Sequence, residues 1–311
     1  MINIGVIGTG HLGRHHARIY SGMDDVRLVG VLDRDPGRAT EVAAASGCEA
    51  VGSLPELLGR VDAVSVAVPT EQHVDVGRAC LDAGVHVLVE KPIASDLAGA
   101  DLLIDAARRN RRLLQVGHVE RFNPVVQAAC RVATQPQFFE VHRLNRFSMR
   151  GLDVDVVLDL MIHDIDIILS MVNSPIAEVR AVGIPVLSTR ADIANVRIEF
   201  GSGCVANLTA SRVSTERVRK LRFFQPHDYL SLDYEAQEGV LLSLDGGQIR
   251  RVALDPERAE PLRLQLAAFV AAIREGSSPL VGGGDGRRSL EVALWVNREI
   301  EAHRSRHPVV R

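Results

Sequence analysis

The chain has 311 residues, of which 46% are hydrophobic and 24% charged, and its formal net charge is -3. This composition is typical of a globular protein and excludes a disordered or fibrous class. A protein that binds a nucleic-acid backbone normally carries a strong basic excess, so we expect no nucleic-acid partner. The length exceeds that of a typical single domain and predicts two domains.

The N-terminus and the cysteines give no indication of secretion or of a metal site. Met1 leads directly into an apolar segment, without the basic stretch and cleavage site of a secretion signal. The apolar runs are too short for a membrane span, which requires roughly 20 residues. The four cysteines form no Cys-x-x-Cys pair and have no suitable histidine spacing. We therefore expect a cytoplasmic protein with free thiols, no bound metal and no membrane insertion.

Over the first 120 residues, short apolar segments alternate with longer helical patterns. The strand-like segments are residues 2–7, 26–32, 63–68, 85–89 and 113–116. The helical patterns are residues 12–22, 37–46, 72–83 and 97–109. The strand-like segments are rich in Val, Ile and Leu with little alternation, as in parallel strands that are buried on both faces. This repetition predicts a right-handed, doubly wound parallel sheet over residues 1–120.

The pattern changes after residue 120 and predicts a second α/β domain over residues 121–311. Helices are expected at residues 159–172, 261–274 and 286–303, the last two separated by a loop at residues 282–284. Alternating segments occur at residues 138–147, 179–187, 195–200, 204–212, 220–225, 229–234 and 240–244. Turn residues between several of them, above all Gly201-Ser202-Gly203, favour antiparallel hairpins. We therefore expect a large, mainly antiparallel sheet.

A glycine-rich loop follows the first predicted strand. Gly8, Gly10 and Gly13 have the G-x-G-x-x-G spacing, and the loop lies between an apolar strand and a helix. Gly8 permits a tight turn, Gly10 lets backbone N–H groups approach a pyrophosphate, and Gly13 lets the helix pack closely on the strand. The loop in this context predicts a dinucleotide-binding site.

Asp33 indicates which dinucleotide is bound. It ends the second predicted strand, 20 residues after Gly13, which is the spacing of an acid that binds the adenosine ribose. Its carboxylate would accept hydrogen bonds from the ribose hydroxyls and repel a 2'-phosphate, which favours NAD over NADP. Arg34 keeps NADP open as an alternative, because a guanidinium at this position could pair with that phosphate.

Two further segments carry candidate catalytic side chains. Lys91, in Glu90-Lys91-Pro92, lies at the carboxyl end of the fifth apolar segment, where its ammonium could stabilise a reacting oxygen. Asp159 and His163 are four residues apart on a predicted helix and so share one face. A histidine can accept a hydroxyl proton while a carboxylate orients it. Taken singly, each segment also fits a structural role: a solvated strand end, or a helix cap beside a packed histidine.

Together, five motifs resemble the glucose-fructose oxidoreductase and inositol dehydrogenase (GFO/IDH/MocA) family. They are the Gly8-x-Gly10-x-x-Gly13 loop, Pro69-Thr70-x-x-His73, Glu90-Lys91-Pro92, Arg121-Phe122-Asn123-Pro124 and Asp159-x-x-x-His163. The resemblance implies an NAD-dependent dehydrogenase with a Rossmann domain and an α/β domain whose open sheet forms homodimers or homotetramers. It implies that the C-terminal helices pack back toward the first domain. It also implies that Lys91, Asp159 and His163 form the catalytic group.

The resemblance further implies two sets of binding residues. The cofactor-binding set is Gly8, Gly10, His11, Leu12, Gly13, Asp33, Arg34, Pro69, Thr70, His73, Glu90 and Lys91. The substrate-binding set is Glu120, Arg121, Asn123 and His163.

Residues 115–124 and 158–166 resemble the branch of this family that contains UDP-N-acetylglucosamine 3-dehydrogenases. This resemblance implies oxidation of the sugar C3 hydroxyl to a ketone, on the route to a 3-amino sugar of lipid A. A basic cluster could bind the diphosphate of such a substrate. Its members are Arg212, Arg217, Arg219, Lys220 and Arg222. The alternatives are a dehydrogenase of an inositol or free sugar, and a non-catalytic NAD-binding regulator.

Overall fold

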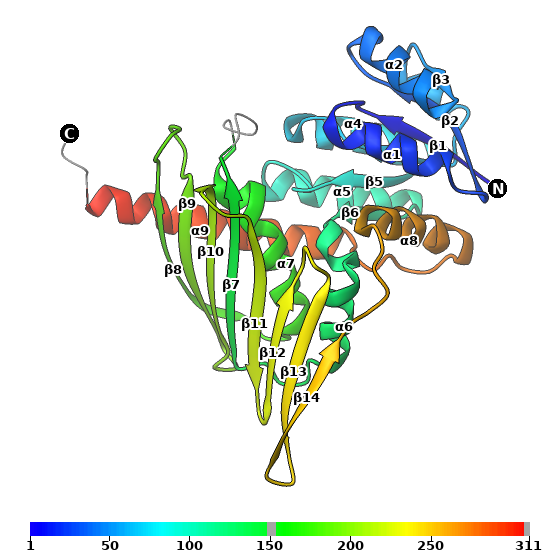
Figure 1. Cartoon of the computed structure of the whole chain (residues 1–311). Helices are drawn as coiled ribbons and strands as arrows, with labels where there is room; N and C mark the ends of the chain where they lie inside the picture. Colours follow the sequence, from blue (N-terminus) through cyan, green and yellow to red (C-terminus); the bar gives the residue numbers. More distant parts are fainter. Residues whose placement is uncertain (148–153, 308–311) are drawn as a thin grey trace. The chain divides into compact units, whose positions relative to one another are not determined.

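The computed structural model describes residues 1–147 and 154–307 (Figure 1). The chain divides into two compact units, Met1–Val119 with Glu260–Leu290, and Glu120–Ala259 with Glu291–Arg311. The sequence pattern places residues 260–290 with the second segment, but their contacts group them with the first. The reason is hydrophobic: Leu266 and Phe269 are buried in the same apolar core as Ile4.

The first unit contains a six-stranded parallel sheet in the order β3-β2-β1-β4-β5-β6. Its strands are β1 (Ile2–Ile7), β2 (Val26–Leu32), β3 (Glu49–Ala50), β4 (Ala63–Val66), β5 (His86–Glu90) and β6 (Leu114–Gly117). Every residue of β4 and β6 is buried, as expected for strands covered on both faces. From the centre of the sheet, the chain adds β2 and β3 on one side of β1 and then β4, β5 and β6 on the other side. This order confirms the predicted doubly wound sheet.

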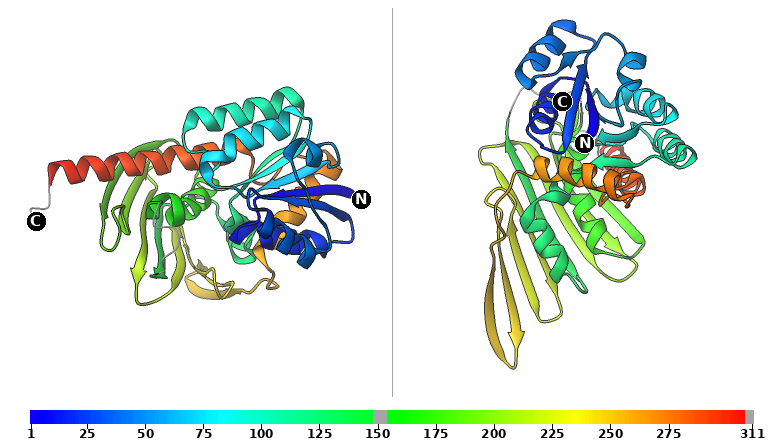
Figure 2. Two further views of the ribbon diagram at one scale, coloured as in Figure 1. Left: turned by 90° about the horizontal axis from the view of Figure 1, so that it is seen from above. Right: turned by 90° about the vertical axis from the view of Figure 1, so that its right-hand side faces the viewer.

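Helices cover both faces of this sheet, α4 and α5 on one side and α1, α2 and α8 on the other (Figure 2). Asp35 and Asp96 begin α2 and α5, and each carboxylate accepts hydrogen bonds from N–H groups of the first turn. The helices are α1 (His11–Ser21), α2 (Pro36–Ser46), α3 (Leu54–Leu58), α4 (His73–Asp82), α5 (Leu97–Asn110) and α8 (Pro261–Glu275).

The second unit contains an eight-stranded sheet in the order β14-β13-β12-β11-β7-β10-β9-β8. Its strands are β7 (Phe138–Arg146), β8 (Ile176–Ile184), β9 (Ile193–Phe200), β10 (Val205–Ser214), β11 (Val218–Gln225), β12 (Asp228–Asp233), β13 (Glu238–Asp245) and β14 (Gln248–Leu254). β7 and β10 pair in parallel, and all other neighbours pair antiparallel. The predicted open, mainly antiparallel sheet is therefore confirmed.

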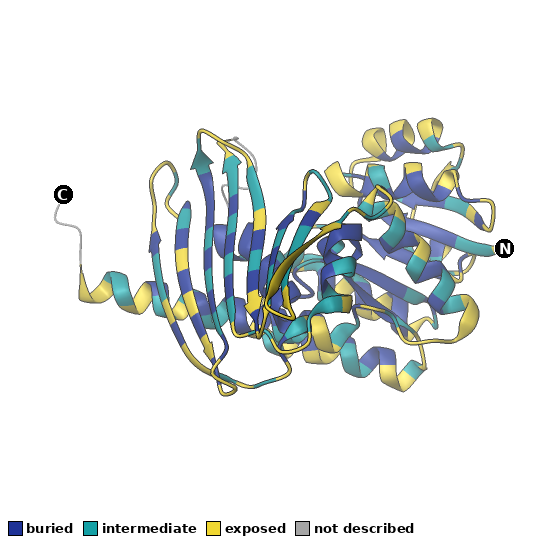
Figure 3. Ribbon diagram, turned by 60° about the horizontal axis from the view of Figure 1, so that its bottom comes forward, coloured by how far each residue is buried: buried dark blue, intermediate teal, exposed yellow. Residues whose placement is uncertain are grey.

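One face of this sheet packs against helices. They are α6 (Pro124–Val132), the π-helical turn η3 (Val157–Met161), α7 (Ile162–Met171) and α9 (Gly283–Arg306). Ile165 of α7 and Val296 of α9 lie in one apolar core with inward side chains of the strands. Buried residues alternate with more exposed ones along β9 (Figure 3). Asn195 and Arg197 are among its exposed residues. This alternation is that of a sheet with one buried face.

The structure contains elements that the sequence pattern did not indicate, namely β3, α3, α6 and β14. The loop expected at residues 282–284 is shorter, because α9 already begins at Gly283. A Cβ at Gly283 would lie 2.8 Å from Ile104, so this glycine allows close packing within the first unit. Across residues 1–147 and 154–307, no helix is both long and apolar enough to cross a membrane.

Candidate active site

The turn that follows β1 is shaped to bind an anion. Gly8 has a φ of +89°, and a Cβ there would lie 2.6 Å from the carbonyl oxygen of Ala67. A Cβ at Gly13 would lie 1.7 Å from the carbonyl oxygen of Gly8, so only glycine lets α1 approach the turn this closely. Around Gly10, a Cβ would meet no described atom within 4 Å. Gly10 caps α1 without a side-chain hydrogen bond, which leaves the helix N-terminus suited to a phosphate.

Asp33 at the end of β2 holds this turn in place. Its Oδ2 accepts hydrogen bonds from the backbone N (2.6 Å) and Oγ1 (2.9 Å) of Thr9, and its Oδ1 accepts one from the backbone N of Asp35 (2.9 Å). Nη1 of Arg38 lies 3.9 Å from Oδ2 of Asp33. Burial raises the pKa of Asp33, but the hydrogen bonds and Arg38 outweigh this effect, so the pKa lies below its usual range. The carboxylate is therefore ionised.

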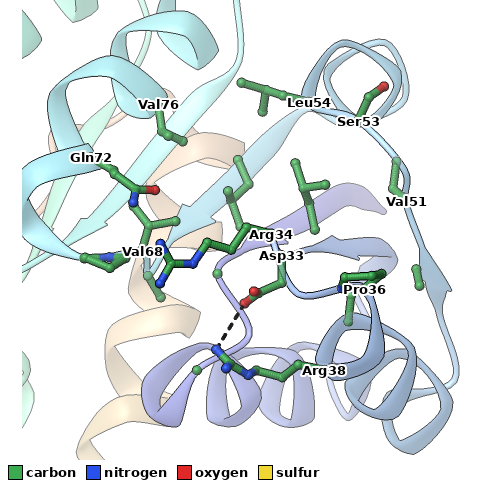
Figure 4. Close-up of a pocket in the computed structure, with 18 of the residues that line it drawn as sticks. Asp33, Arg34, Pro36, Arg38, Val51, Ser53, Leu54, Val68, Gln72 and Val76 are labelled. Carbon is green, nitrogen blue, oxygen red and sulfur yellow. Dashed lines mark ion pairs between the residues drawn. The ribbon is translucent and has the colours of Figure 1, made fainter.

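A cavity of about 910 Å³ lies beside this turn (Figure 4). Its volume is within the range of small-molecule and cofactor sites. The predicted cofactor residues that line it are Gly8, Gly10, His11, Leu12, Asp33, Arg34 and Pro69. The remaining predicted ones, Gly13, Thr70, His73, Glu90 and Lys91, are not among its lining residues. A helix N-terminus, a carboxylate and a largely apolar wall fit the pyrophosphate, ribose and adenine of a dinucleotide.

Several lining residues were not indicated by the sequence pattern. They are Pro36, Arg38, Val51, Ser53, Leu54, Gln72 and Val76 (Figure 4). Arg38 adds a second guanidinium beside Asp33, on the first turns of α2. The sequence does contain a signal for one of them, because Ser53 before a helix and Pro55 in its first turn are typical of a helix start, here that of α3.

His73 joins the ends of two neighbouring strands. Its Nδ1 lies 2.9 Å from the carbonyl oxygen of Pro92, and its Nε2 lies 3.0 Å from that of Val68. Burial lowers the pKa of His73, and the two carbonyl oxygens and Glu90, which raise it, offset this effect only in part, so the pKa lies below its usual value. Because both ring nitrogens contact backbone carbonyl oxygens, the side chain fixes the turn that carries Lys91.

Glu90 supports the same turn from inside the sheet. Its Oε1 lies 3.1 Å from Nε2 of His16, and both side chains are buried. A Cβ at Gly117 would lie 2.7 Å from Oε1, so glycine on β6 makes room for the carboxylate. Burial raises the pKa of Glu90, but His16 and Lys91 outweigh it and the pKa is lowered. The half-buried Lys91 thus follows a fixed acid at the carboxyl end of β5.

In the second unit, Asp159 and His163 lie where the π-helical turn passes into α7. The carboxylate of Asp155 accepts hydrogen bonds from the N–H groups of Val157 (2.9 Å) and Leu158 (3.0 Å), which starts the turn. The sequence predicts a regular helix here. A π-helical turn within a helix is frequently found at functional sites. Asp159 and His163 are both half-buried, unlike the buried isoleucines that follow in α7.

The predicted substrate residues before α6 are engaged by other protein groups. Glu120 accepts a hydrogen bond from Nη1 of Arg143 (2.9 Å), and both side chains are buried. Nδ2 of Asn123 donates to Glu120 (3.3 Å) and to the carbonyl oxygen of Tyr234 (3.0 Å). Arg121 lies 3.5 Å from Asp166 in an ion pair. These contacts give the three residues a structural part, and their contact with substrate stays a prediction.

The predicted diphosphate cluster is divided by the sheet, and Arg212 is engaged by other protein groups. Nε of Arg212 donates to Asp192 (3.0 Å), and Nη2 donates to the carbonyl oxygens of Val154 (2.6 Å) and Ala191 (3.2 Å). The guanidinium is buried and fixes the segment before β9. The other members lie on or beside β11, where alternation along the strand places them on two faces.

Two family models match the chain. The model described as "Oxidoreductase family, NAD-binding Rossmann fold" (GFO_IDH_MocA) matches residues 2–118, and the GFO/IDH/MocA C-terminal domain matches residues 125–225. Together they cover most of the sequence and agree with the two folds described above.

Known proteins resemble the chain over almost its whole length. A UDP-N-acetylglucosamine 3-dehydrogenase from Acidithiobacillus ferrooxidans is 38% identical over 96% of this chain and 97% of its own. A solved structure of UDP-N-acetylglucosamine 3-dehydrogenase from that organism has a TM-score of 0.93, covering 97% of this chain and 98% of its own. An inositol 2-dehydrogenase from Rhizobium meliloti is 25% identical over 97% of this chain and 98% of its own. The chain therefore belongs to the GFO/IDH/MocA family of oxidoreductases with an NAD-binding Rossmann fold.

Proposed function

We propose that this protein is an NAD-dependent dehydrogenase that oxidises the C3 hydroxyl of UDP-N-acetylglucosamine to a ketone. The observation that supports this substrate is the 38% identity to a UDP-N-acetylglucosamine 3-dehydrogenase, over almost the whole length of both chains. Oxidoreductase chemistry agrees with the dinucleotide-shaped cavity and with Lys91 at the carboxyl end of β5. A 3-keto sugar is a substrate for an aminotransferase, which fits the expected route to a 3-amino sugar of lipid A in the cytoplasm.

The preference for NAD over NADP rests on Asp33. Its ionised carboxylate lines the cavity and would oppose a 2'-phosphate. Arg34 and Arg38 also line the cavity, but Asp33 and Asp35 both pair with Arg38 and reduce its availability to a phosphate. We therefore propose NAD as the cofactor, with NADP used less well.

The proposed chemistry assigns a task to each catalytic residue. Bound NAD would supply the hydride acceptor for the carbon that carries the reacting hydroxyl. His163 accepts the hydroxyl proton as general base, and Asp159 orients the imidazole and stabilises its charged form. The Lys91 ammonium donates a hydrogen bond to the same oxygen and polarises it as the carbonyl forms. Glu90 and His73 are positioning residues for Lys91, since they hold the turn that carries it.

The second candidate is oxidation of an inositol, which the likeness to inositol 2-dehydrogenase supports at lower identity. The two candidates make different demands on the protein. A nucleotide sugar needs a site for a diphosphate, whereas an inositol does not. A non-catalytic NAD-binding regulator would retain the glycine turn but would not need Lys91 or His163.

Purified protein with NAD should form NADH, measured at 340 nm, when UDP-N-acetylglucosamine is added. Myo-inositol and free N-acetylglucosamine should give little or no NADH. Lys91→Ala should abolish turnover while NAD binding, measured by calorimetry, is retained, because Lys91 does not line the dinucleotide cavity. NADH formation with inositol but not with UDP-N-acetylglucosamine would show that the substrate is an inositol. Full activity of the Lys91→Ala protein would refute the catalytic assignment.

We also propose that the protein forms a homodimer or homotetramer through the second unit. The outward face of the eight-stranded sheet supports this, because Asn195–Thr209 and Arg197–Asn207 hydrogen bonds order its polar side chains. Light scattering coupled to size-exclusion chromatography would give the mass, and a monomer would contradict the proposal.

A further inference from the structure

Two arginines lie directly opposite each other on neighbouring strands of the second unit. Arg143 on β7 pairs with Arg219 on β11 in the antiparallel ladder. Like charges in such positions are destabilising unless acids compensate them. Glu120 is the carboxylate that they share: Nη1 of Arg143 lies 2.9 Å from its Oε1, and Nη1 of Arg219 lies 3.5 Å from the same atom.

The two guanidinium groups are not equally satisfied. Arg143 donates one hydrogen bond to Glu120 and two more to Asp164, at 2.7 and 2.9 Å. Arg219 has only the longer ion pair with Glu120, and its buried Nε finds no acceptor within residues 1–147 and 154–307. A guanidinium has five N–H donors. Burial and the charge of Arg143 both lower the pKa of Arg219, so a further anion would stabilise its charged form.

Tyr234 and Arg217 lie beside Arg219. Tyr234 donates its backbone N–H to the carbonyl oxygen of Arg219, and its hydroxyl group is buried with no partner in the described part of the chain. Arg217 lies immediately before β11, and its exposed guanidinium pairs with Glu235 at 3.3 Å. The Arg219 side chain is 27% exposed, so a ligand can reach it from solvent.

This group lies on the helix-covered side of the sheet, near the beginning of α7. Arg143 links the Arg219 group to the beginning of α7, because it binds Glu120 and also Asp164, the residue that follows His163. The other basic residues of β11 point the opposite way. Arg222 pairs with Glu140 on the outward face, and Lys220 is exposed there.

We propose that Arg219, with Arg217, binds the diphosphate of a nucleotide-sugar substrate. The inference rests on the proposed function and narrows the predicted basic cluster to Arg219, on the helix-covered face, and Arg217, immediately before β11. A diphosphate supplies acceptor oxygens that a guanidinium fork can bind in pairs, which an uncharged inositol cannot do. Arg219 thus favours a nucleotide sugar over a free sugar or inositol, without taking part in the chemical step.

Binding of UDP to the full-length protein tests this directly. Calorimetry should be carried out with saturating NAD, so that UDP does not report on the dinucleotide cavity. Arg219→Gln should weaken the Kd for UDP about tenfold or more, since it removes charge-assisted hydrogen bonds. Arg222→Gln is the matched control, on the same strand but the opposite face, and should bind UDP as the wild type does. Arg217→Gln changes a more exposed side chain and should also weaken binding, which provides a second variant if Arg219→Gln folds poorly.

Steady-state kinetics separates this inference from the proposed function. The KM for UDP-N-acetylglucosamine should rise in Arg219→Gln by about the factor seen for UDP, with a much smaller change in kcat. If UDP-N-acetylglucosamine is oxidised but both variants have the KM and Kd of Arg222→Gln, the inference is overturned and the function stands. If UDP binding depends on Arg219 but no NADH forms, the function is overturned and the anion site stands. Failure of the wild-type protein to bind UDP overturns the inference.

Discussion

Arg143 on β7 holds Asp164 on α7 through two hydrogen bonds, from Nε at 2.7 Å and from Nη2 at 2.9 Å. Each side chain is only 2% exposed. Because Asp164 follows His163 directly, this bidentate ion pair fixes the first turn of α7 against the sheet. The arrangement couples the position of a proposed catalytic residue to the stability of the second unit.

Arg143→Met should destabilise the protein by about 3–5 kcal/mol, because it leaves the buried Asp164 carboxylate without its partner. Urea unfolding measured by circular dichroism gives the free energy of unfolding. The matched control is Arg180→Met, which breaks the exposed ion pair with Glu178 and should change stability far less, because solvent screens an exposed pair. Equal effects of the two substitutions would show that the buried pair contributes little.

The sequence predicts the first unit well because its signals are local. Val-rich segments, the glycine spacing and Asp33 each lie within one strand-turn-helix stretch, and the structure places them as expected. The short elements were not predicted for a related reason. β3 has two residues and α3 has five, which is too few for a hydrophobic period to be recognised.

The parts of the site that the sequence did not indicate depend on contacts between distant residues. The ring of His73 contacts the carbonyl oxygen of Pro92, and the guanidinium of Arg212 contacts Asp192. No spacing rule predicts either pair. The face that a strand residue occupies also depends on register, and a shift by one residue reverses it. For this reason the basic residues of β11 look like one cluster in the sequence but lie on two faces in the structure.

Asp192 should make the second unit sensitive to acid. Its Oδ2 accepts hydrogen bonds from the N–H groups of Val186, Leu187 and Ser188, at 2.6 to 2.8 Å, and Arg212 donates to Oδ1. Burial raises the pKa of Asp192, but the hydrogen bonds outweigh this strongly and the pKa lies well below its usual range. A carboxylate whose pKa is lowered on folding stabilises the protein above its unfolded pKa of about 3.9. That stability is lost as the pH falls below this value toward the folded pKa.

Asp192→Asn should therefore lower the Tm at pH 7 and reduce the loss of Tm between pH 5 and pH 3, relative to wild type. Differential scanning calorimetry across this pH range measures both effects. Asp245→Asn is a suitable control, since Asp245 is 67% exposed in its pair with Arg250. An unchanged Tm for Asp192→Asn at pH 7 would contradict the proposed role of the carboxylate.

Asp33→Ser should shift cofactor use toward NADP. The substitution removes the charge that opposes a 2'-phosphate and leaves Arg34 and Arg38 in the cavity wall. We expect the ratio of kcat/KM for NADP to that for NAD to rise about tenfold or more. Thr9→Val is the control, because it removes one hydrogen bond to Asp33 but keeps the carboxylate, and should leave the ratio near its wild-type value. A ratio unchanged in Asp33→Ser would show that other residues select the cofactor.

Gly10→Ala and Gly13→Ala should separate cofactor binding from folding. At Gly10 a Cβ meets no described atom within 4 Å, but the backbone φ of -65° with ψ of -154° lies outside the regions that alanine favours, so alanine should lower the Tm far less than at Gly13. Its methyl group would occupy the space in which a pyrophosphate approaches α1, so the Kd for NAD should rise about tenfold or more. At Gly13 the Cβ would lie 1.7 Å from the carbonyl oxygen of Gly8, so alanine must displace α1 and lower the Tm. Thermal unfolding without cofactor and calorimetry with NAD distinguish the two variants. If Gly10→Ala binds NAD as tightly as the wild type, the pyrophosphate does not lie over this turn.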